Sequence, residues 1–388
     1  MNQLETTPYR LPEDREQLLK VLAGGGALAL LAGFFIAPER AWTSLLMAGY
    51  LLVCLGLAGL FFVAVQFASG AAWSIAFRRI PEAMSQVLPY GAAMLAVFFV
   101  FGSSVYPWRH PGEHFTGFKA AWLNLPFFLF RAAVFLGLWY LFARVIVRAS
   151  RQGDDQPLPG PNRQGIRLSV IFLVVFAATY WLASFDWIMS LEPHWASTIF
   201  GIYNFAGMFS SGLAVMILLL AWMRRSGPLF SFITAEHFHD LGKLLFGFTT
   251  FWMYIWFSQY MLIWYANIPE ETVYYLRRQY RFWEPLFLAN VFLNWVIPFT
   301  TLLPRWTKRD PAWLSRIALA VVLGRLLDLY LMIHPAAGGQ HPSFGLWELG
   351  ALAMASALFV LVFVKVFREA LPVPAGDMQL AESMHYHN

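Results

Sequence analysis

Residues 42–68 read WTSLLMAGYLLVCLGLAGLFFVAVQFA, an apolar run without a single charged side chain. A helix needs about 20 residues to cross the roughly 30 Å hydrocarbon core of a bilayer, so this run is long enough to span a membrane. The run also lacks the alternation of polar and apolar residues that a β-barrel strand requires. It therefore predicts an α-helical membrane protein.

Further apolar segments of spanning length flank this run on both sides. Together they predict an all-α polytopic membrane protein with about ten transmembrane helices. We expect one membrane domain over residues 18–367, a polar segment at residues 1–17 and a tail at residues 368–388. The predicted helices lie at residues 18–37, 42–68, 83–102, 120–147, 167–190, 197–223, 237–265, 282–303, 312–333 and 346–367.

The composition of the whole chain agrees with this interpretation. Of its 388 residues 59% are hydrophobic and 13% are charged, whereas a soluble domain is roughly 45–50% apolar and about 25% charged. The 37 Phe and 17 Trp residues are too many for a surface in contact with water. Soluble enzymes, disordered proteins and nucleic-acid-binding modules are therefore excluded, and we expect membrane lipid, not nucleic acid, around the chain.

The basic residues predict the orientation in the membrane. Lys and Arg are enriched in cytoplasmic loops, and most of the 27 such residues fall on one side of the predicted helices. This distribution, which also accounts for the net charge of +5, places both termini in the cytoplasm. The exceptions on the outer side are Arg40, Arg109, Lys119, Arg277, Arg278 and Arg281.

Cysteine and histidine usage bears on redox cofactors. Cys54 is the single cysteine, so the chain by itself cannot form an internal disulfide or a cysteine-based iron–sulfur, zinc or c-type haem site. The nine histidines lie outside the helix centres, which argues against a b-type haem. We therefore expect no metal and no redox cofactor bound by this chain.

Proline and glycine suggest where the helices bend and end. Pro89, Pro126 and Pro298 fall inside predicted helices, where kinks are expected. Residues 151–163 (RQGDDQPLPGPNR) are rich in Gly, Pro and charge. We expect this segment to be a linker between the first four helices and the rest.

Ionisable residues within the membrane are the candidate functional residues. Each costs a few kcal/mol on insertion scales and therefore faces a bundle interior or a cavity. By depth they form a cytoplasmic group, a midplane group and an outer group, which together make a candidate proton pathway. The groups are His237, His239, Asp240 and Lys243; Arg131 and Arg325; and Asp186, Glu192, His194, Asp328 and Glu348.

Spacing along the helices suggests which of these residues meet. Asp240 and Lys243 are three residues apart, as are Arg325 and Asp328, so each couple can pair on one helix face. Arg131 has no acidic neighbour in its own helix and must find a partner across the bundle. A capped helix start and structural salt bridges explain these residues equally well. The sequence also leaves open whether the pathway is continuous or consists of two separate halves.

Two longer stretches carry a resemblance to a known family. They are residues 184–207 (SFDWIMSLEPHWASTIFGIYNFAG) and residues 238–275 (FHDLGKLLFGFTTFWMYIWFSQYMLIWYANIPEETVYY). The chain resembles the ActF-type, NrfD/polysulfide-reductase-like membrane subunits of bacterial alternative complex III. Its length, helix count and predicted orientation fit that family over the whole chain.

The resemblance implies a role in electron transport. The family belongs to a quinol:electron-acceptor oxidoreductase of respiratory or photosynthetic chains in the bacterial inner membrane. It implies two four-helix bundles, here at about residues 42–190 and 197–333, with two peripheral helices. The implied partners are a sister NrfD-like membrane subunit and outer subunits that carry haem c and iron–sulfur clusters. Quinone or quinol is the implied small molecule.

Other interpretations remain open at the level of sequence. A proton-coupled secondary transporter and a purely structural membrane anchor both accommodate buried charges. The aromatic stripe at residues 246–265 is typical of packing against neighbours and lipid, although some of its rings could line a quinone pocket. Arg277, Arg278 and Arg281 violate the inside bias, and we expect their loop to contact an acidic face of an outer partner.

Overall fold

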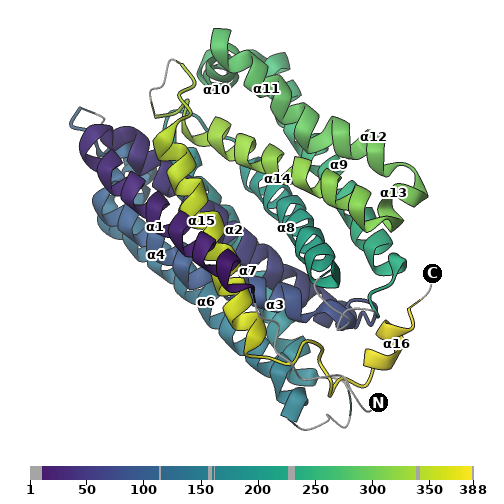
Figure 1. Cartoon of the computed structure of the whole chain (residues 1–388). Coiled ribbons are helices and arrows are strands. Elements are labelled where there is room, and N and C mark those ends of the chain that lie inside the picture. The colour runs from purple at the N-terminus through teal and green to yellow at the C-terminus, as the bar shows by residue number, and fades with distance from the viewer. Residues whose placement is uncertain are drawn as a thin grey trace.

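The structure is a computed structural model that describes residues 11–112, 115–155, 160, 162–225, 232–337 and 341–386. Across these residues it consists of helices joined by short turns, without a β-strand (Figure 1). This confirms the predicted all-α polytopic membrane protein. The α-helices are α1 (Glu13–Ile36), α2 (Pro38–Ser69), α3 (Arg79–Ser85), α4 (Leu88–Phe101), α5 (Gly117–Trp122), α6 (Leu125–Asp155), α7 (Arg163–Trp187), α8 (Phe200–Arg225), α9 (Ala235–Ala266), α10 (Pro269–Gln279), α11 (Glu284–Val291), α12 (Ile297–Leu302), α13 (Arg305–Arg309), α14 (Pro311–Ile333), α15 (Leu346–Arg368) and α16 (Leu380–Met384).

Eight helical segments of the described chain are long and apolar enough to cross a membrane. They coincide with eight of the ten predicted helices. The other two predicted helices are α9 and α14, which are 32 and 23 residues long. α9 is less apolar because it is rich in Trp and Tyr, and α14 carries Arg316, Arg325 and Asp328. The spans are Glu13–Ile36, Pro38–Ser69, Arg79–Phe101, Leu125–Gln152, Arg163–Leu191, Phe200–Arg225, Arg281–Leu302 and Leu346–Arg368.

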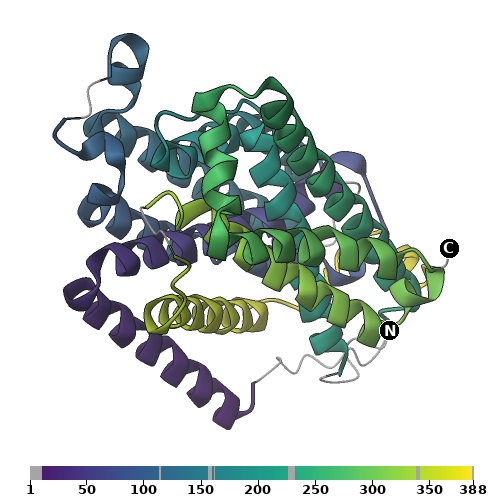
Figure 2. The ribbon, with the colours of Figure 1, turned by 90° about the horizontal axis from the view of Figure 1, so that it is seen from above.

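The helices pack as two groups and a pair. In the first helix group α2 contacts α3, α4 and α7, and α6 contacts α4 and α7. In the second helix group α8 contacts α9 and α14, which also contact α12. α1 and α15 pack on each other and on α2 as a peripheral pair, seen side by side in both views (Figures 1 and 2).

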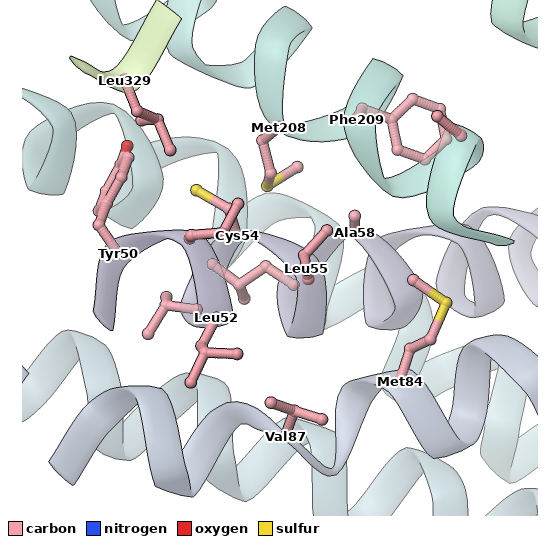
Figure 3. Packing of buried hydrophobic residues seen from close by; sticks show 14 of the residues in the cluster. Tyr50, Leu52, Cys54, Leu55, Ala58, Met84, Val87, Met208, Phe209 and Leu329 are labelled. Atoms are coloured by element: carbon pink, nitrogen blue, oxygen red, sulfur yellow. The ribbon is translucent and has the colours of Figure 1, made fainter. Parts of the chain in front are cut away.

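α2 lies at the centre because small residues let both helix groups approach it. A methyl group added at Gly212 of α8 would lie 2.1 Å from the Ala58 side chain of α2. On another face, a methyl group at Gly59 would lie 2.5 Å from the Pro81 carbonyl oxygen. Close packing of this kind is typical of membrane helices. Figure 3 shows the result, with α2 between Met84 on one side and Met208 on the other.

The three prolines predicted to kink helices lie instead in the first turns of α4, α6 and α12. The predicted irregularity is therefore found as a break before Pro89 and a π-helical turn before Pro298. Pro126 is in the first turn of α6, where its missing N–H has no partner to lose. Pro89 opens α4 after a break that separates it from α3. Pro298 opens α12 directly after a π-helical turn at Phe292–Val296. That turn accommodates the proline, because a regular helix would clash with its ring.

The predicted linker is shorter than expected. α6 continues to Asp155 and α7 begins at Arg163, so half of residues 151–163 is helical. Asp154 is held there by Arg79 at 2.5 Å, an ion pair that extends the helix beyond its apolar part. Residues 156–159 and 161 lie outside the described residues.

The two faces of the helix array differ in what they carry. α1 begins, and α15 ends, on the side that also holds α13 and α16 (Figure 1). We call this the terminal side, and the charge distribution predicts that it is cytoplasmic. The opposite side holds α10 and the turn between α7 and α8, which contains a 3₁₀ helix at Met189–Leu191.

Candidate functional site

The candidate residues at the start of α9 form an ion-pair cluster on the terminal side. Asp240 Oδ1 lies 2.5 Å from Lys243 Nζ, the pair that the spacing predicted. Glu236, which the sequence analysis did not single out, accepts Arg309 at 2.5 Å and lies 3.6 Å from His239 Nδ1. His239 therefore faces Glu236 rather than Lys243. The cluster is partly exposed and is reachable from the terminal side.

His237 completes this cluster but points inward. Its Nδ1 accepts a hydrogen bond from the backbone N–H of Thr234 at 3.1 Å, which closes a capping box at the helix start. Its ring lies between Phe77 and Tyr386. The structural explanation, a capped helix start, thus holds for His237.

A second ion-pair cluster on the terminal side was missed by the sequence analysis. Glu82 is fully buried and lies 2.6 Å from Arg79 Nη1. Ser150 Oγ donates a hydrogen bond to its other oxygen. The carboxylate therefore joins α3 to α6. Its place near the predicted start of a helix, three residues after Arg79, was the one signal available.

Arg131 finds the partner across the bundle that the sequence required. Its Nε donates to Asp186 Oδ2 at 2.6 Å and its Nη2 donates to Oδ1 at 3.0 Å. Trp122 Nε1 donates to the same carboxylate, and the guanidinium lies over the Trp122 ring. Every oxygen of Asp186 is thus used locally. Arg131 is six positions from the start of α6 and not near the midplane, because the predicted helix contains the break between α5 and α6.

The deepest charges, Arg325 and Asp328, pair on α14 as predicted. Arg325 Nη1 donates to Asp328 Oδ2 at 2.6 Å, and each residue is 1% exposed. The other carboxylate oxygen accepts hydrogen bonds from Tyr203 of α8 and from Asn290 Nδ2 of α11. Three helices of the second group therefore meet at Asp328.

The same network continues into the first helix group. Arg325 Nη2 donates to Asn204 Oδ1 at 3.4 Å, and Tyr50 of α2 donates to the same oxygen at 3.3 Å. Tyr50 and Tyr180 of α7 are in turn hydrogen-bonded. Arg325 Nε has no hydrogen-bond partner among the described residues. The network is thus shared between both groups and is not fully saturated.

A glycine provides the room for the guanidinium group. A methyl group at Gly207 of α8 would lie 2.3 Å from Arg325 Nη1. In the neighbouring turn of α14, a methyl group at Gly324 would lie 2.8 Å from the Asn294 side chain. The two glycines thus allow polar side chains to lie where ordinary helices would bury a Cβ atom.

On the opposite side, Glu192 is held by Arg278. Arg278 Nη2 donates to Glu192 Oε1 at 2.7 Å, and its other N–H groups donate to the carbonyl oxygens of Tyr274 and Leu331. The guanidinium lies 3.5 Å from the Tyr274 ring, which stacks on Trp195 at 4.0 Å. These contacts attach α10 to the turn before α8.

The three arginines of the basic outer loop differ in where they lie, and their contact with an outer partner stays a prediction. Arg278 is 2% exposed and Arg277 Nη1 lies 3.8 Å from Glu192 Oε2, so both face an acidic residue of the same chain. Glu192 lies 85 and 86 positions before Arg277 and Arg278 in the sequence. No local sequence pattern therefore reveals that these arginines have an acidic partner within the chain. Arg277 and Arg281 are exposed, whereas Arg278 is buried.

Two cavities lie on either side of the Arg278–Glu192 pair. A groove of about 1220 Å³ opens on the opposite side and is lined by Glu192, His194 and Arg281. A cavity of about 10 Å³, enough for one water molecule, is lined by Arg278, Asn290 and Asp328. The Arg278–Glu192 pair thus separates the outer groove from the deep Asp328 carboxylate.

The polar residues and cavity that adjoin Asp328 toward the opposite side have no equivalent along α14 toward the terminal side. Before Arg325, the buried residues of α14 are nonpolar, from Leu314 to Val321. These eight positions span about 10 Å at a rise of 1.5 Å per residue. α8 packs against α14 and buries Ile217 and Leu220 toward its terminal-side end. The buried residues of α14 between the deep network and the Asp240 cluster are therefore nonpolar, while Ser210, Ser211 and Thr249 are the buried polar residues of α8 and α9 in this region.

Glu348 lies apart from both paths. It begins α15 and accepts two hydrogen bonds from Arg40 of α2, at 3.0 and 2.8 Å. Its Oε2 also accepts the backbone N–H of Gly345. The residue joins the peripheral pair to the first helix group, and the structure does not bring it together with Asp328.

The aromatic stripe of α9 divides into two faces. Trp252 and Trp256 are buried, the first beside Tyr203 and the second beside Phe287. Other rings of the stripe, such as Tyr265, are exposed where lipid would lie. Gln259 accepts a hydrogen bond from Ser197 at 3.1 Å and donates one to Tyr275 at 3.0 Å, the cross-element bonding expected of a polar residue in an apolar helix.

Comparison with known proteins adds no assignment to this geometry. No protein-family model matches the chain, and no curated protein matches it. Within the described part of the chain, no group of three or more His, Cys, Asp or Glu residues could hold a metal ion.

Proposed function

We propose that the chain is an integral membrane subunit of a quinol-oxidising electron-transfer complex of the alternative complex III type. Its own part is to conduct protons between the opposite side and the buried Asp328. Haem c and iron–sulfur clusters would reside in partner subunits, beside a sister membrane subunit. Both stretches that carry the family resemblance contribute to this path, Glu192 and Tyr203 in the first and Tyr274 in the second.

One observation carries the proposal, namely the unequal surroundings of Asp328. Toward the opposite side, a water-sized cavity and the Arg278–Glu192 pair lie between the carboxylate and a large groove. Toward the terminal side, nonpolar residues from Leu314 to Val321 separate it from Asp240. A buried carboxylate with polar groups on one side and nonpolar residues on the other suits local proton release or uptake.

The groove on the opposite side has a lining suited to the head group of a quinol. Trp195 and Trp283 supply flat apolar walls, and Glu192 and His194 place a carboxylate and an imidazole at the same groove. The groove volume of about 1220 Å³ is somewhat above the range of about 300–1,000 Å³ that is typical of small-molecule sites. In this role Arg278 holds Glu192 in place, and the cavity beyond it leads a released proton toward Asp328.

The two alternative functions have less support from the geometry. Inverted-repeat transporters break helices at corresponding positions of their halves. Here the break between α3 and α4 lies in the second spanning helix of the first group, whereas the π-helical turn at Phe292–Val296 lies in the third of the second group. A purely structural anchor would not require a partly unsaturated arginine beside a cavity.

The deciding experiment is gentle extraction of native membranes followed by purification through a tag on this chain. We expect multi-haem cytochrome c and iron–sulfur subunits to co-purify, with a haem spectrum and quinol-oxidation activity. A colourless, solitary protein would refute the proposal. Solute uptake by liposomes that contain only this chain would then favour the transporter.

A further inference from the structure

Two exposed tryptophans mark a corner of the second helix group on the terminal side. Trp306 of α13 is 58% exposed and Trp313 of α14 is 42% exposed. Their rings meet edge to face, with 5.9 Å between the ring centres. α13 is the turn between α12 and α14 (Figure 1), so the pair lies where the chain leaves one helix and enters the next. Exposed Trp residues at such a level are typical of the boundary between lipid and water.

An exposed arginine lies one turn further along α14. The Arg316 guanidinium carbon is 4.8 Å from the centre of the Trp313 ring, and no carboxylate of the described residues pairs with it. Leu319 and Leu323, three and seven positions later on the same helix face, are also exposed. From the terminal side inward, this face therefore carries an aromatic ring, a cation and about 10 Å of apolar surface.

α13 adds further positive charge to this corner. Arg305 and Arg309 lie 4.0 Å and 2.5 Å from Glu236, so one carboxylate faces two guanidinium groups. Lys308 is buried and donates to three backbone carbonyl oxygens at the end of α12, and Asp310 accepts a backbone N–H at the start of α14. With the arginine of α14 included, the corner contains four basic and two acidic side chains. It thus keeps a surplus of two positive charges.

The chemistry of this corner indicates which molecule would cover it. A guanidinium group donates paired N–H groups to phosphate oxygens. A surplus of positive charge favours a head group with a net negative charge over a zwitterionic one, in which an ammonium offsets the phosphate. The exposed leucines of α14 continue the surface inward, where an acyl chain can contact them and a soluble phosphate cannot.

We propose that this corner binds an acidic phospholipid of the leaflet on the terminal side, such as phosphatidylglycerol. The Arg316 guanidinium donates to the lipid phosphate, Trp306 and Trp313 contact the glycerol region, and Leu319 and Leu323 contact an acyl chain. The corner lies on the side of the molecule away from the groove. This inference therefore does not rest on the proposed electron-transfer role.

The start of α7 offers a matched comparison. Arg167 is likewise exposed in the second turn of a helix that begins on the terminal side, and Val170 and Val174 on the same face are exposed. In the described structure no aromatic ring lies under its guanidinium group. Arg167 thus represents a basic residue above an apolar surface without the tryptophan pair.

The test is retention of lipid by the full chain. The chain is reconstituted with equal amounts of phosphatidylglycerol, phosphatidylethanolamine and phosphatidylcholine that have the same acyl chains. It is then extracted in mild detergent and weighed by native mass spectrometry. We expect phosphatidylglycerol to be preferred about tenfold or more, because each basic side chain near a membrane surface favours anionic lipid about fivefold. Equal retention of the three lipids would overturn the proposal.

Two variants locate the site. Arg316→Gln should lower the preference about fivefold, whereas Arg167→Gln should leave it as it is. Both side chains are exposed, so both variants should fold. An unchanged preference in Arg316→Gln would overturn the proposal. An equal fall in both variants would do the same, because anionic lipid would then bind to basic residues in general.

A second measurement identifies what covers the corner in native membranes. Photoleucine is incorporated in place of Leu319, and the crosslinked products are identified by mass spectrometry after illumination. We expect crosslinks to phospholipid, with phosphatidylglycerol enriched over its share of the membrane. Crosslinks to another protein chain would assign the corner to a protein partner and would refute the proposal.

Discussion

The two buried Arg–Asp pairs of this protein have the same chemistry and opposite surroundings. Arg131 and Asp186 are saturated within the first helix group by each other and by Trp122. Arg325 and Asp328 distribute their hydrogen bonds over α8, α11 and α14, and Asn204 of α8 passes the network on to Tyr50 of the first helix group. Arg325 Nε has no partner among the described residues. A water-sized cavity adjoins Asp328.

This difference shows how to distinguish a structural ion pair from a functional candidate. A pair whose every lone pair and N–H is used locally can do nothing but hold its helices together. A pair that shares its hydrogen bonds, keeps one donor unused and adjoins a cavity can exchange protons without losing its position. The predictions below test this distinction.

The largest effect should come from breaking the saturated pair. Asp186→Leu leaves the Arg131 guanidinium buried without a counter-charge, which costs about 3–5 kcal/mol. We expect the yield of monodisperse protein and its Tm to fall sharply, as measured by fluorescence-detected size exclusion and thermal unfolding. Arg131→Met combined with Asp186→Leu should recover most of the loss, because both charges are then absent. A double variant as unstable as the single one would show that the pair does more than fasten α6 to α7.

Removing the space beside Arg325 should have the next largest effect. Gly207→Ala puts a methyl group where it would lie 2.3 Å from Arg325 Nη1, and overpacking of this kind costs about 1–3 kcal/mol. We expect a lower Tm. Gly24→Ala is the control, because nothing lies within 4 Å of its new methyl group and the helix should gain up to about 1 kcal/mol. Equal Tm changes in the two variants would mean that the guanidinium does not need this space.

The function of the unsaturated pair is tested by removing the charge of Asp328 but not its shape. Asp328→Asn can still accept hydrogen bonds from Tyr203 and Asn290 but leaves Arg325 without a counter-charge, so turnover is compared per amount of assembled complex. Since the amide cannot exchange a proton, quinol-driven turnover in the purified complex should fall about tenfold or more, equivalent to about 1.4 kcal/mol. Asp14→Asn, an exposed change on α1, should leave turnover as it is. Normal turnover in Asp328→Asn would place this pair with the structural ones.

The smallest expected effect concerns pH and the end of α14. Burial lowers the pKa of His334, which caps this helix, from 6.5 to about 4. The unfolded chain therefore binds the proton more readily than the folded chain. The contribution of His334 to the free energy of unfolding is fully present above pH 6.5 and is lost as the pH falls toward 4. At pH 5.5 the loss should be about 1 kcal/mol.

This effect is measured as the difference in Tm between pH 7.5 and pH 5.5. His334→Gln should reduce the difference, because the amide does not titrate. His110→Gln changes an exposed histidine of the first helix group and should not reduce it. A pH dependence that is the same in all three proteins would assign it to other groups.

Local patterns predicted a good part of the candidate site. The Asp240–Lys243 and Arg325–Asp328 pairs follow from their spacing of three residues, because one helix turn brings such side chains together. The lack of a local partner predicted that Arg131 pairs across the bundle, although not with which residue. Tyr203, Asn290 and Glu82 escaped notice, since tyrosine, asparagine and a carboxylate near a helix end are common in membrane helices without any function.

The amino-acid sequence by itself determined that the protein lies in a membrane and where its helices are. Hydropathy and helix length are properties of each segment alone. The tertiary structure decided which charges meet. Glu192 and Arg278 are 86 positions apart, and Asp328 is 125 positions from Tyr203. Such contacts depend on how the helices pack. In a membrane, small residues such as Gly207 and Gly212 let helices approach closely. Whether two helices fit together depends on both of their surfaces, so the sequence of one segment does not reveal it.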